Sequence, residues 1–140
     1  DIPQNTASII RTCSCLGLML EIIEPCGFIV TDRKFKRVVM DYYDSKNIHF
    51  YKSPDDFFMN KKNTRIILMT TKSKKSYKEF LFKQNDTILF GRESSGVPIG
   101  VHKKVNYKLT IPIVNRKRSL NLSSSVSIVV SKILNQDNFK

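Results

Sequence analysis

The stretch "NRKRSLNLSSSVSIVVSKIL", from Asn115 to Leu134, passes from a cluster of cations through a serine-rich segment into an apolar run. From Leu122 onward the apolar residues recur at steps of four, three, one, three and one, which is the stripe of an amphipathic helix. Serine runs usually mark loops. Small hydroxyl residues also let a backbone pack closely, and their oxygens can cap the free N–H groups at a helix start. The stretch therefore predicts a closely packed loop followed by a buried helix.

Upstream of this stretch, short apolar runs alternate with helical patterns. Strands are predicted at residues 18–24, 48–51, 65–71, 86–91 and 107–113. Helices are predicted after Asn5, in the basic segment that begins at Asp32, and after Ser53. The third helix has a strong start, because Pro54 takes the first helical position and two acidic residues follow it. This alternation predicts one α/β domain over residues 1–140 with a mostly parallel sheet flanked by helices.

The first predicted helix uses Asn5 as its N-cap, buries Ile9, Cys13 and Leu16, and stops at Gly17. The three cysteines of the chain follow no disulfide-scaffold spacing, which favours a reducing cytoplasm. Two of them lie two residues apart on this helix and so face different sides, and both histidines are distant in sequence. No metal site is expected on these grounds. No membrane span is expected either, because no apolar run approaches about 18 residues.

The charge of the chain points to its class of partner. The 140 residues include 24 basic and 12 acidic ones, which gives a formal net charge of +12. Such a charge favours a polyanion as partner, and nucleic acid is the commonest polyanion. A codon bias toward Lys, Asn and Ile explains the same composition equally well. Three basic clusters are candidates for phosphate contacts: Arg33, Lys34, Lys36 and Arg37; Lys72, Lys74 and Lys75; Arg116, Lys117 and Arg118.

Unusual loops follow three of the predicted strands, in the segments "ILMTTKSKK", "ILFGRESSGVP" and "LTIPIVNRKRSLNLSSS". Proteins with parallel α/β sheets bind ligands beyond the carboxyl ends of their strands. None of the three loops matches the phosphate-cradling pattern GxxxxGK[ST], and no GxGxxG follows the first strand. These absences disfavour an ATPase or an ordinary dinucleotide-binding enzyme. The sequence thus predicts a ligand site of another kind, built from three loops.

Three segments, "PQNTASIIRTCSCLGL", "ILFGRESSGVP" and "IPIVNRKRSLNLSSSVSIVV", resemble in order and spacing the motifs of the SpoU family, within the SPOUT class of RNA methyltransferases. The segment "IIEPCGF", followed by a basic helix and "DYY", is similar to the compact branch that methylates the 2′-hydroxyl of the tRNA wobble nucleotide, cytidine or uridine. The resemblance implies an α/β trefoil knot, S-adenosylmethionine as the methyl donor and a homodimer as the active unit. It also implies the tRNA anticodon stem-loop as substrate and a cytoplasmic location.

The same resemblance assigns residues to the site. Gly91 matches the glycine where the chain passes close to the adenosine. The expected cofactor-binding residues are Met69, Thr70, Thr71, Gly91, Glu93, Gly96, Ile111, Ser119, Leu120 and Asn121. The expected catalytic residues are Arg11, Asn5 and Asn121, and the expected RNA-binding residues are Arg33, Lys34, Arg37, Arg116 and Arg118.

Arg11 matches a position to which the family scheme gives a role in deprotonating the hydroxyl. A guanidinium stays protonated, so we expect Arg11 to orient a phosphate and to stabilise developing alkoxide charge. The alternative interpretation makes Arg11 a solvated cation on the exposed side of its helix.

Departures from the family pattern leave other functions open. The apolar strand that precedes the first motif in the family is not in this sequence, and Ser124 and Ser131 stand where an asparagine and a tyrosine are usual. One alternative is a SpoU methyltransferase acting on another RNA, such as ribosomal RNA. The absence of an additional RNA-binding domain favours tRNA. The second alternative is a catalytically decayed RNA-binding paralogue, against which the complete cofactor loops argue.

Overall fold

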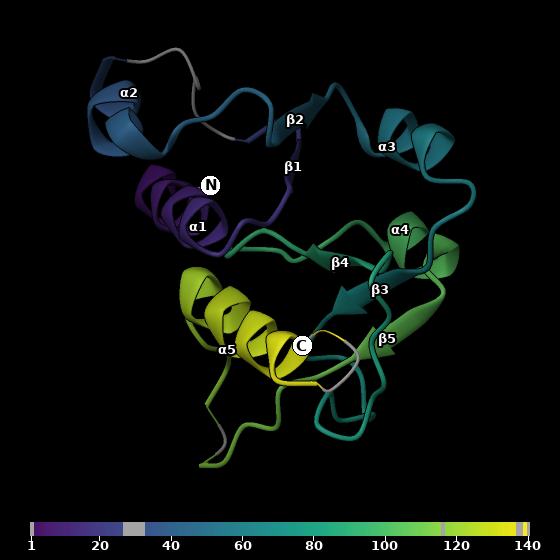
Figure 1. The fold of residues 1–140 in the computed structure, drawn as a ribbon. Coiled ribbons are helices and arrows are strands. Elements are labelled where there is room, and N and C mark those ends of the chain that lie inside the picture. Colours follow the sequence, from purple (N-terminus) through teal and green to yellow (C-terminus); the bar gives the residue numbers. More distant parts are fainter. Residues whose placement is uncertain (1, 27–32, 116, 137–138, 140) are drawn as a thin grey trace. The chain divides into compact units, whose positions relative to one another are not determined.

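The computed structural model describes residues 2–26, 33–115, 117–136 and 139, and the chain divides into two compact units (Figure 1). Unit 1 is Asp1–Lys62 and unit 2 is Asn63–Lys140. Each unit has its own sheet and its own hydrophobic core. We describe each unit by itself, and the expectation of one domain stays a prediction.

Unit 1 combines a two-stranded sheet with helices. It contains α1 (Pro3–Cys15), β1 (Leu20–Ile23), α2 (Arg33–Val39), the 3-10 helix η1 (Met40–Tyr42), β2 (Ile48–Tyr51) and α3 (Pro54–Asn60). The two strands pair in parallel, with Leu20 opposite Ile48. The core residues come from α1, α2 and β2: Ala7, Ile10, Phe35, Val39 and Ile48. The predicted start of the basic helix, Asp32, lies outside the described residues.

The start of α1 differs from the prediction. The helix begins at Pro3, and its N-cap position is Ile2, with no side-chain cap. Proline suits the first turn of a helix because its φ is already helical and its missing N–H has no partner to lose there. Asn5 therefore lies inside the helix, where it is 6% exposed. The prediction that Asn5 is the N-cap was wrong.

The buried face of α1 is also shifted from the predicted one. Ile10 and Cys13 are buried at a spacing of three residues, whereas Ile9 is half-buried. Leu16 follows the last residue of the helix and is 46% exposed, so its predicted burial was wrong. Gly17 follows with a φ of +66°, a left-handed conformation that glycine adopts without strain, and it ends the helix as predicted.

The second half of unit 1 follows the sequence closely. β2 occupies residues 48–51 as predicted, and α3 begins at Pro54. The N–H of Asp56 donates to Ser53 Oγ at 3.1 Å, which confirms Ser53 as the cap. Phe57 on α3 is fully buried and meets the ring of Tyr51 edge-on at a centroid distance of 5.3 Å.

Unit 2 is built on a three-stranded parallel sheet. It contains β3 (Ile66–Met69), β4 (Thr87–Phe90), α4 (Ile99–Lys104), β5 (Tyr107–Leu109) and α5 (Leu122–Leu134), and the strand order is β4-β3-β5. The predicted α/β class with parallel sheets and flanking helices is confirmed. The short helix α4 was not predicted, and the trefoil knot stays a prediction. No described helix has the length and apolarity needed to cross a membrane.

Helix α5 covers one face of the sheet in unit 2 (Figure 1). Side chains alternate along a strand, and Ile67 and Met69 point to the face where Val129 of α5 packs. The end of the helix is also fixed. The side-chain amide of the buried Gln136 accepts from the Phe82 N–H at 3.2 Å and donates to the Phe82 carbonyl at 3.1 Å. The helix that follows the serine run is therefore held at both its middle and its end.

Candidate active site

The carboxyl ends of the three strands of unit 2 meet at one edge of the sheet. Met69 on the central strand lies opposite Phe90 on one side and Leu109 on the other. The residues that follow, Thr70 and Gly91 among them, leave the sheet at the same edge. All the predicted cofactor-binding residues belong to unit 2, where Met69, Thr70, Thr71 and Gly91 lie at neighbouring strand ends and the others lie farther along the loops that follow.

The first loop leaves β3 at Thr70. The Thr70 N–H donates to the Leu109 carbonyl at 2.8 Å, which ties the start of the loop to the neighbouring strand. Thr70 is half-buried and Thr71 is exposed, so their hydroxyls can reach a ligand at this edge. Met69 is different, because its side chain is 8% exposed and packs in the core beneath α5. Among these predicted residues, the two threonines have the more accessible side chains.

The second loop closes tightly on itself between Gly91 and Gly96. Arg92 and Gly96 exchange two backbone hydrogen bonds, at 3.1 and 3.0 Å, around residues 93–95. A Cβ built on Gly91 would lie 2.6 Å from the Gly96 carbonyl carbon and 2.9 Å from the Val97 nitrogen. Gly96 has a φ of +69°, which side chains rarely adopt. Position 91 thus requires glycine because the backbone of its own loop leaves no room for a Cβ.

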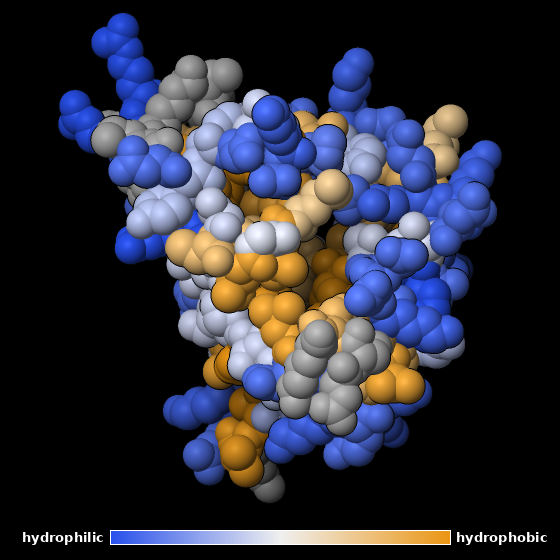
Figure 2. Space-filling model, viewed as in Figure 1, coloured by the Kyte–Doolittle hydropathy of each residue, from blue (hydrophilic) through white to orange (hydrophobic). Residues whose placement is uncertain are grey.

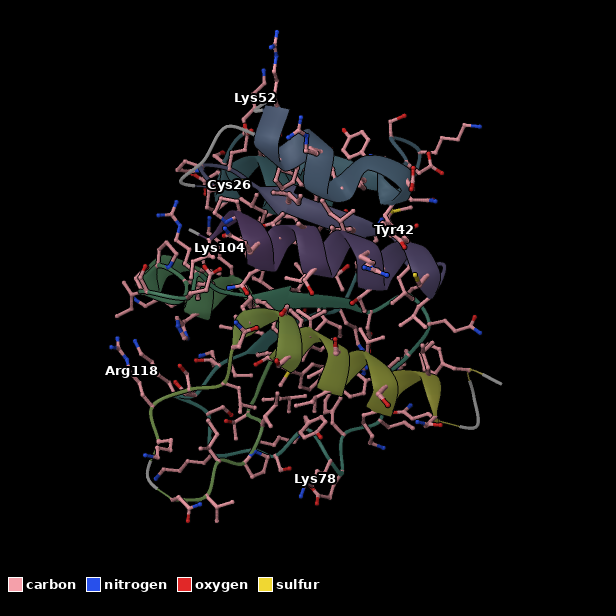
Figure 3. All side chains as sticks on the ribbon, turned by 90° about the vertical axis from the view of Figure 1, so that its left-hand side faces the viewer. Cys26, Tyr42, Lys52, Lys78, Lys104 and Arg118 are labelled. Atoms are coloured by element: carbon pink, nitrogen blue, oxygen red, sulfur yellow. The ribbon has the colours of Figure 1, made fainter. Side chains whose placement is uncertain are left out.

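The third loop runs from β5 to α5. Ile111 packs against the core beneath it, whereas Leu120 is 42% exposed and Val114 is 80% exposed. Figure 2 shows hydrophobic surface at the outer tip of this loop, at the lower left of the view. The guanidinium of Arg118 donates to the Ser94 carbonyl at 3.5 Å, a long contact that joins the third loop to the second. Arg118 comes from the segment that leads into α5 (Figure 3).

Asn121 is the N-cap of α5. Its Oδ1 accepts from the Ser123 N–H at 3.0 Å, the Ser124 N–H at 3.3 Å and the Ser123 hydroxyl at 2.7 Å. The Ser125 hydroxyl donates to the Asn121 carbonyl at 3.0 Å. The serine run thus forms the first turn of the helix, but the free N–H groups are capped by Asn121, whereas the serine oxygens were predicted to cap them. The catalytic and cofactor roles of Asn121 stay predictions beside this capping role.

The remaining predicted catalytic residues, Asn5 and Arg11, belong to α1 in unit 1. Asn5 is buried and Arg11 is exposed. The Arg11 guanidinium lies over the Tyr42 ring, 4.8 Å from its centroid, and Figure 3 labels Tyr42. Stacking on an aromatic face holds a planar guanidinium in one orientation while leaving its N–H groups available. Arg11 is therefore an exposed but oriented cation.

The predicted RNA-binding residues are only partly described. Arg33 and Arg37 are exposed one helical turn apart on α2, and Arg118 is exposed on the third loop. Arg116 and the side chain of Lys34 lie outside the described residues. Within the parts of the chain that the structure covers, no group of three or more His, Cys, Asp or Glu residues is placed to hold a metal ion.

Sequence reasoning missed the polar contacts that shape the loops. Ser73 donates its hydroxyl to the Lys108 carbonyl at 2.8 Å, and Ser94 offers its carbonyl to Arg118. The segment "KSKKS" was interpreted only as a basic patch. Its serines at a spacing of three, each two residues before a lysine, were the available signal for a repeated turn.

A parallel sheet whose strands are followed by loops at one carboxyl edge is the arrangement of an α/β ligand-binding domain. The chain belongs to the SpoU rRNA Methylase family, whose model matches residues 1–131. The tRNA (cytidine(34)-2'-O)-methyltransferase of Beijerinckia indica is 39% identical over 97% of this chain and 86% of that protein. The Escherichia coli protein of the same name is 33% identical over 93% of this chain and 84% of its own length.

Solved structures of the same fold are similar over nearly the whole chain. One structure, from work on the 2-OH methylation of C/U34 on tRNA, has a TM-score of 0.90 and 31% identity, and the match covers 97% of this chain and 90% of that one. The SpoU methyltransferase AviRb from Streptomyces viridochromogenes, in complex with AdoMet, has a TM-score of 0.82 and 21% identity. That match covers 95% of this chain and 53% of the other, and at this identity it shows the fold alone.

Proposed function

We propose that this protein transfers a methyl group from S-adenosylmethionine to the ribose 2′-hydroxyl of nucleotide 34, a cytidine or uridine, in tRNA. The observation that carries the proposal is the similarity to relatives named for this reaction, which extends over nearly the whole chain and includes all three loops. The solved structure at 31% identity and a TM-score of 0.90 supports the same substrate.

Ribosomal RNA is the second candidate substrate, because the description of the family refers to rRNA. The solved rRNA methyltransferase from Sinorhizobium meliloti is 20% identical to this chain, and a similarity at this level shows only the fold. Relatives above 30% identity carry the tRNA name instead. The balance of similarity therefore favours tRNA.

The residues of the three loops fit the cofactor chemically. S-adenosylmethionine has an apolar purine, a polar ribose and a charged amino-acid end. The three loops include aliphatic side chains at Ile111 and Leu120, hydroxyls at Thr70 and Ser119, and a half-buried carboxylate at Glu93. A ligand of mixed polarity needs such a mixture of apolar walls and a few polar groups. We propose that these loops hold the cofactor.

When bound, the cofactor supplies a methyl group that is already activated by its sulfonium charge. The protein then has to hold the ribose hydroxyl in line with the carbon–sulfur bond, which is mainly a matter of positioning. We propose that Arg11 does this by binding a phosphate and stabilising the charge that develops on the ribose oxygen. Its stacking on Tyr42 supports this role, because the guanidinium is oriented before RNA arrives.

We also propose a homodimer that works in the cytoplasm. The predicted interface includes α1 and α5, and the apolar stripe of α5 leaves Ile128 37% exposed beyond the buried Val126 and Val129. Half-covered apolar side chains of this kind are frequent at interfaces. The cytoplasm is favoured by the tRNA substrate and by the free thiols of Cys13 and Cys15. Sedimentation of a monomer at micromolar concentration would count against the dimer.

The central experiment uses purified protein, radiolabelled S-adenosylmethionine and a tRNA transcript. The proposal expects one methyl group per tRNA, located at nucleotide 34 by mass mapping. The matched control is the same tRNA with a 2′-deoxynucleotide at position 34, which lacks the nucleophile and should accept no methyl group. Methylation of ribosomal RNA instead, or calorimetry that detects no cofactor binding, would contradict the proposal.

The role of Arg11 has its own test. Arg11→Ala should leave cofactor affinity nearly unchanged and lower the single-turnover rate by about two to three orders of magnitude, as expected for a lost charged contact in the transition state. Arg11→Lys should recover little, because an ammonium cannot reproduce the planar fork. If Arg11 is instead a solvated surface cation, Arg11→Ala should change the free energy of activation by less than about 0.5 kcal/mol. Near-normal rates in Arg11→Ala would remove the catalytic assignment.

A further inference from the structure

The positive charge of the chain is concentrated in one of its two units. Residues 1–62 include nine basic and eight acidic residues, a formal charge of +1. Residues 63–140 include fifteen basic and four acidic residues, a formal charge of +11. A codon bias would raise lysine in both units alike. The asymmetry therefore points to a local cause in unit 2.

Part of this charge lies on a repeated turn in the segment "TTKSKKSYK", residues 70–78. Three hydroxyl residues, Thr70, Ser73 and Ser76, occur every third position. Each hydroxyl oxygen accepts from the backbone N–H two residues later, which belongs to a lysine each time. The acceptor distances are 3.2 Å for Lys72, 3.1 Å for Lys75 and 3.1 Å for Lys78.

The turns are anchored along the outer edge of β5, which is an edge strand of the sheet. The Thr110 N–H donates to the Lys75 carbonyl at 2.8 Å, and the Tyr77 N–H donates to the Thr110 carbonyl at 3.0 Å. The Ser73 hydroxyl holds the Lys108 carbonyl at 2.8 Å. The backbone that carries these lysines is therefore fixed, and we call Lys72, Lys74, Lys75, Lys78 and Lys108 the lysine ridge.

The exposed cations of the ridge have no carboxylate partner among residues 2–26, 33–115, 117–136 and 139. In the described residues, none of the four exposed side chains at positions 72, 74, 75 and 78 forms an ion pair with a carboxylate. Lys78 projects outward at the bottom of Figure 3. The Lys75 ammonium lies 5.4 Å from the centroid of Phe80 and 5.7 Å from that of Tyr107, whose side chain is 38% exposed.

Two lysines of the ridge lie close enough to His102 to influence its charge. The pKa of His102 on α4 is lowered by its partial burial and by the charges of Lys72 and Lys108. Fixed, uncompensated cations beside an exposed aromatic ring are the usual components of a surface that binds the backbone and unpaired bases of RNA.

We propose that the lysine ridge binds the phosphate backbone of the RNA substrate, outside the reacting nucleotide and without reading its sequence. This inference rests on the proposed function for the identity of the RNA. The ridge would supply affinity and a fast encounter, whereas the loops at the carboxyl edge supply the chemistry. Its residues Lys74, Lys75 and Lys78 are not among the predicted catalytic or cofactor-binding residues, so they can be replaced without touching that machinery.

The test compares three triple variants by tRNA binding as a function of salt concentration. The ridge variant is K74A/K75A/K78A, the charge-keeping variant is K74R/K75R/K78R, and the matched control is K46A/K52A/K62A in unit 1, where the lysines are also exposed. We expect the ridge variant to bind tRNA about 10- to 100-fold more weakly at low salt, and its salt slope to fall by about 2 to 3. The arginine variant and the unit 1 control should stay near wild type.

A second readout separates the ridge from the proposed function. The KM for tRNA should rise in the ridge variant, while the rate at saturating tRNA and the calorimetric affinity for S-adenosylmethionine stay unchanged. If the wild type binds tRNA but methylates none, the proposed function fails and the binding comparison still decides the ridge. Equal salt slopes for the ridge variant and the unit 1 control would overturn the inference. The inference would also be overturned if the ridge variant lost binding to vesicles of acidic phospholipid but kept its binding to tRNA.

Discussion

Unit 1 and unit 2 differ in how closely their acidic residues balance their basic residues in number. In unit 1, whose formal charge is +1, Glu21 accepts from the Tyr51 hydroxyl at 2.8 Å and pairs with Lys61 at 2.6 Å. In unit 2, one carboxylate, Asp86, pairs with Arg65, while the lysine ridge has no such partners among the described residues. A unit that leaves its charge uncompensated gives up some stability for interaction with a polyanion.

A glycine in unit 1 and a glycine in unit 2 are required for different reasons. Gly17 in unit 1 needs glycine only for its positive φ, because nothing lies within 4 Å of a built Cβ. Gly91 in unit 2 needs glycine because its own loop leaves no room for a Cβ. The tight backbone and the free charge occur in the unit that contains the proposed cofactor loops.

The largest expected effect on stability comes from the buried carboxylate of unit 2. The side chain of Asp86 is 4% exposed and accepts from Arg65 Nε at 2.7 Å, Arg65 Nη2 at 2.6 Å and the Lys83 N–H at 2.8 Å. Asp86→Ala leaves these donors without their acceptor and should lower the free energy of unfolding by about 3 kcal/mol. Asp44→Ala, which removes an exposed turn acceptor in unit 1, should cost less than about 1 kcal/mol. Equal shifts in urea unfolding would contradict this contrast.

An intermediate effect is expected from the two glycines. Gly91→Ala should cost about 2 kcal/mol, because backbone atoms 2.6 to 2.9 Å from the new Cβ must move. Gly17→Ala should cost about 1 kcal/mol, since only the left-handed φ is strained. Calorimetry adds the functional half of the comparison. The affinity for S-adenosylmethionine should fall in Gly91→Ala and stay at the wild-type value in Gly17→Ala. An unchanged affinity in both variants would contradict the proposal that the second loop binds the cofactor.

The smallest effect is a pH dependence confined to unit 1. Burial and the hydrogen bond to Glu21 raise the pKa of Tyr51 to about 12, from about 10 in the unfolded chain. The folded state therefore favours the neutral phenol. Its contribution to stability is complete below about pH 10 and is lost as the pH rises toward 12. Urea unfolding between pH 9 and 12 should show this loss in the wild type, and Tyr51→Phe should remove it. The same slope in Tyr51→Phe would refute the assignment.

The sequence by itself determined the elements that depend on local physics. The apolar stripe from Leu122 specified α5, since a period of 3.6 residues allows only one buried helical face. The pattern of Ser53, Pro54 and two acids specified the start of α3, because each of these residues satisfies or complements the free N–H groups of the first turn. The apolar runs predicted as strands at residues 65–71 and 86–91 specified β3, which is buried, and β4, which is half-buried, and the motif order specified the family.

Only the three-dimensional structure showed which partners these residues have. Asn121 was predicted from a motif as a ligand-binding residue, and the structure adds that its Oδ1 serves three donors at the start of α5. Gly91 was assigned to a ligand, yet its nearest obstacle is Gly96, five residues along the same loop. The hydroxyl repeat of the lysine ridge gained its meaning from pairing with Thr110, more than thirty residues away. That last pairing depends on the register between distant segments, and the sequence within either segment does not contain that register.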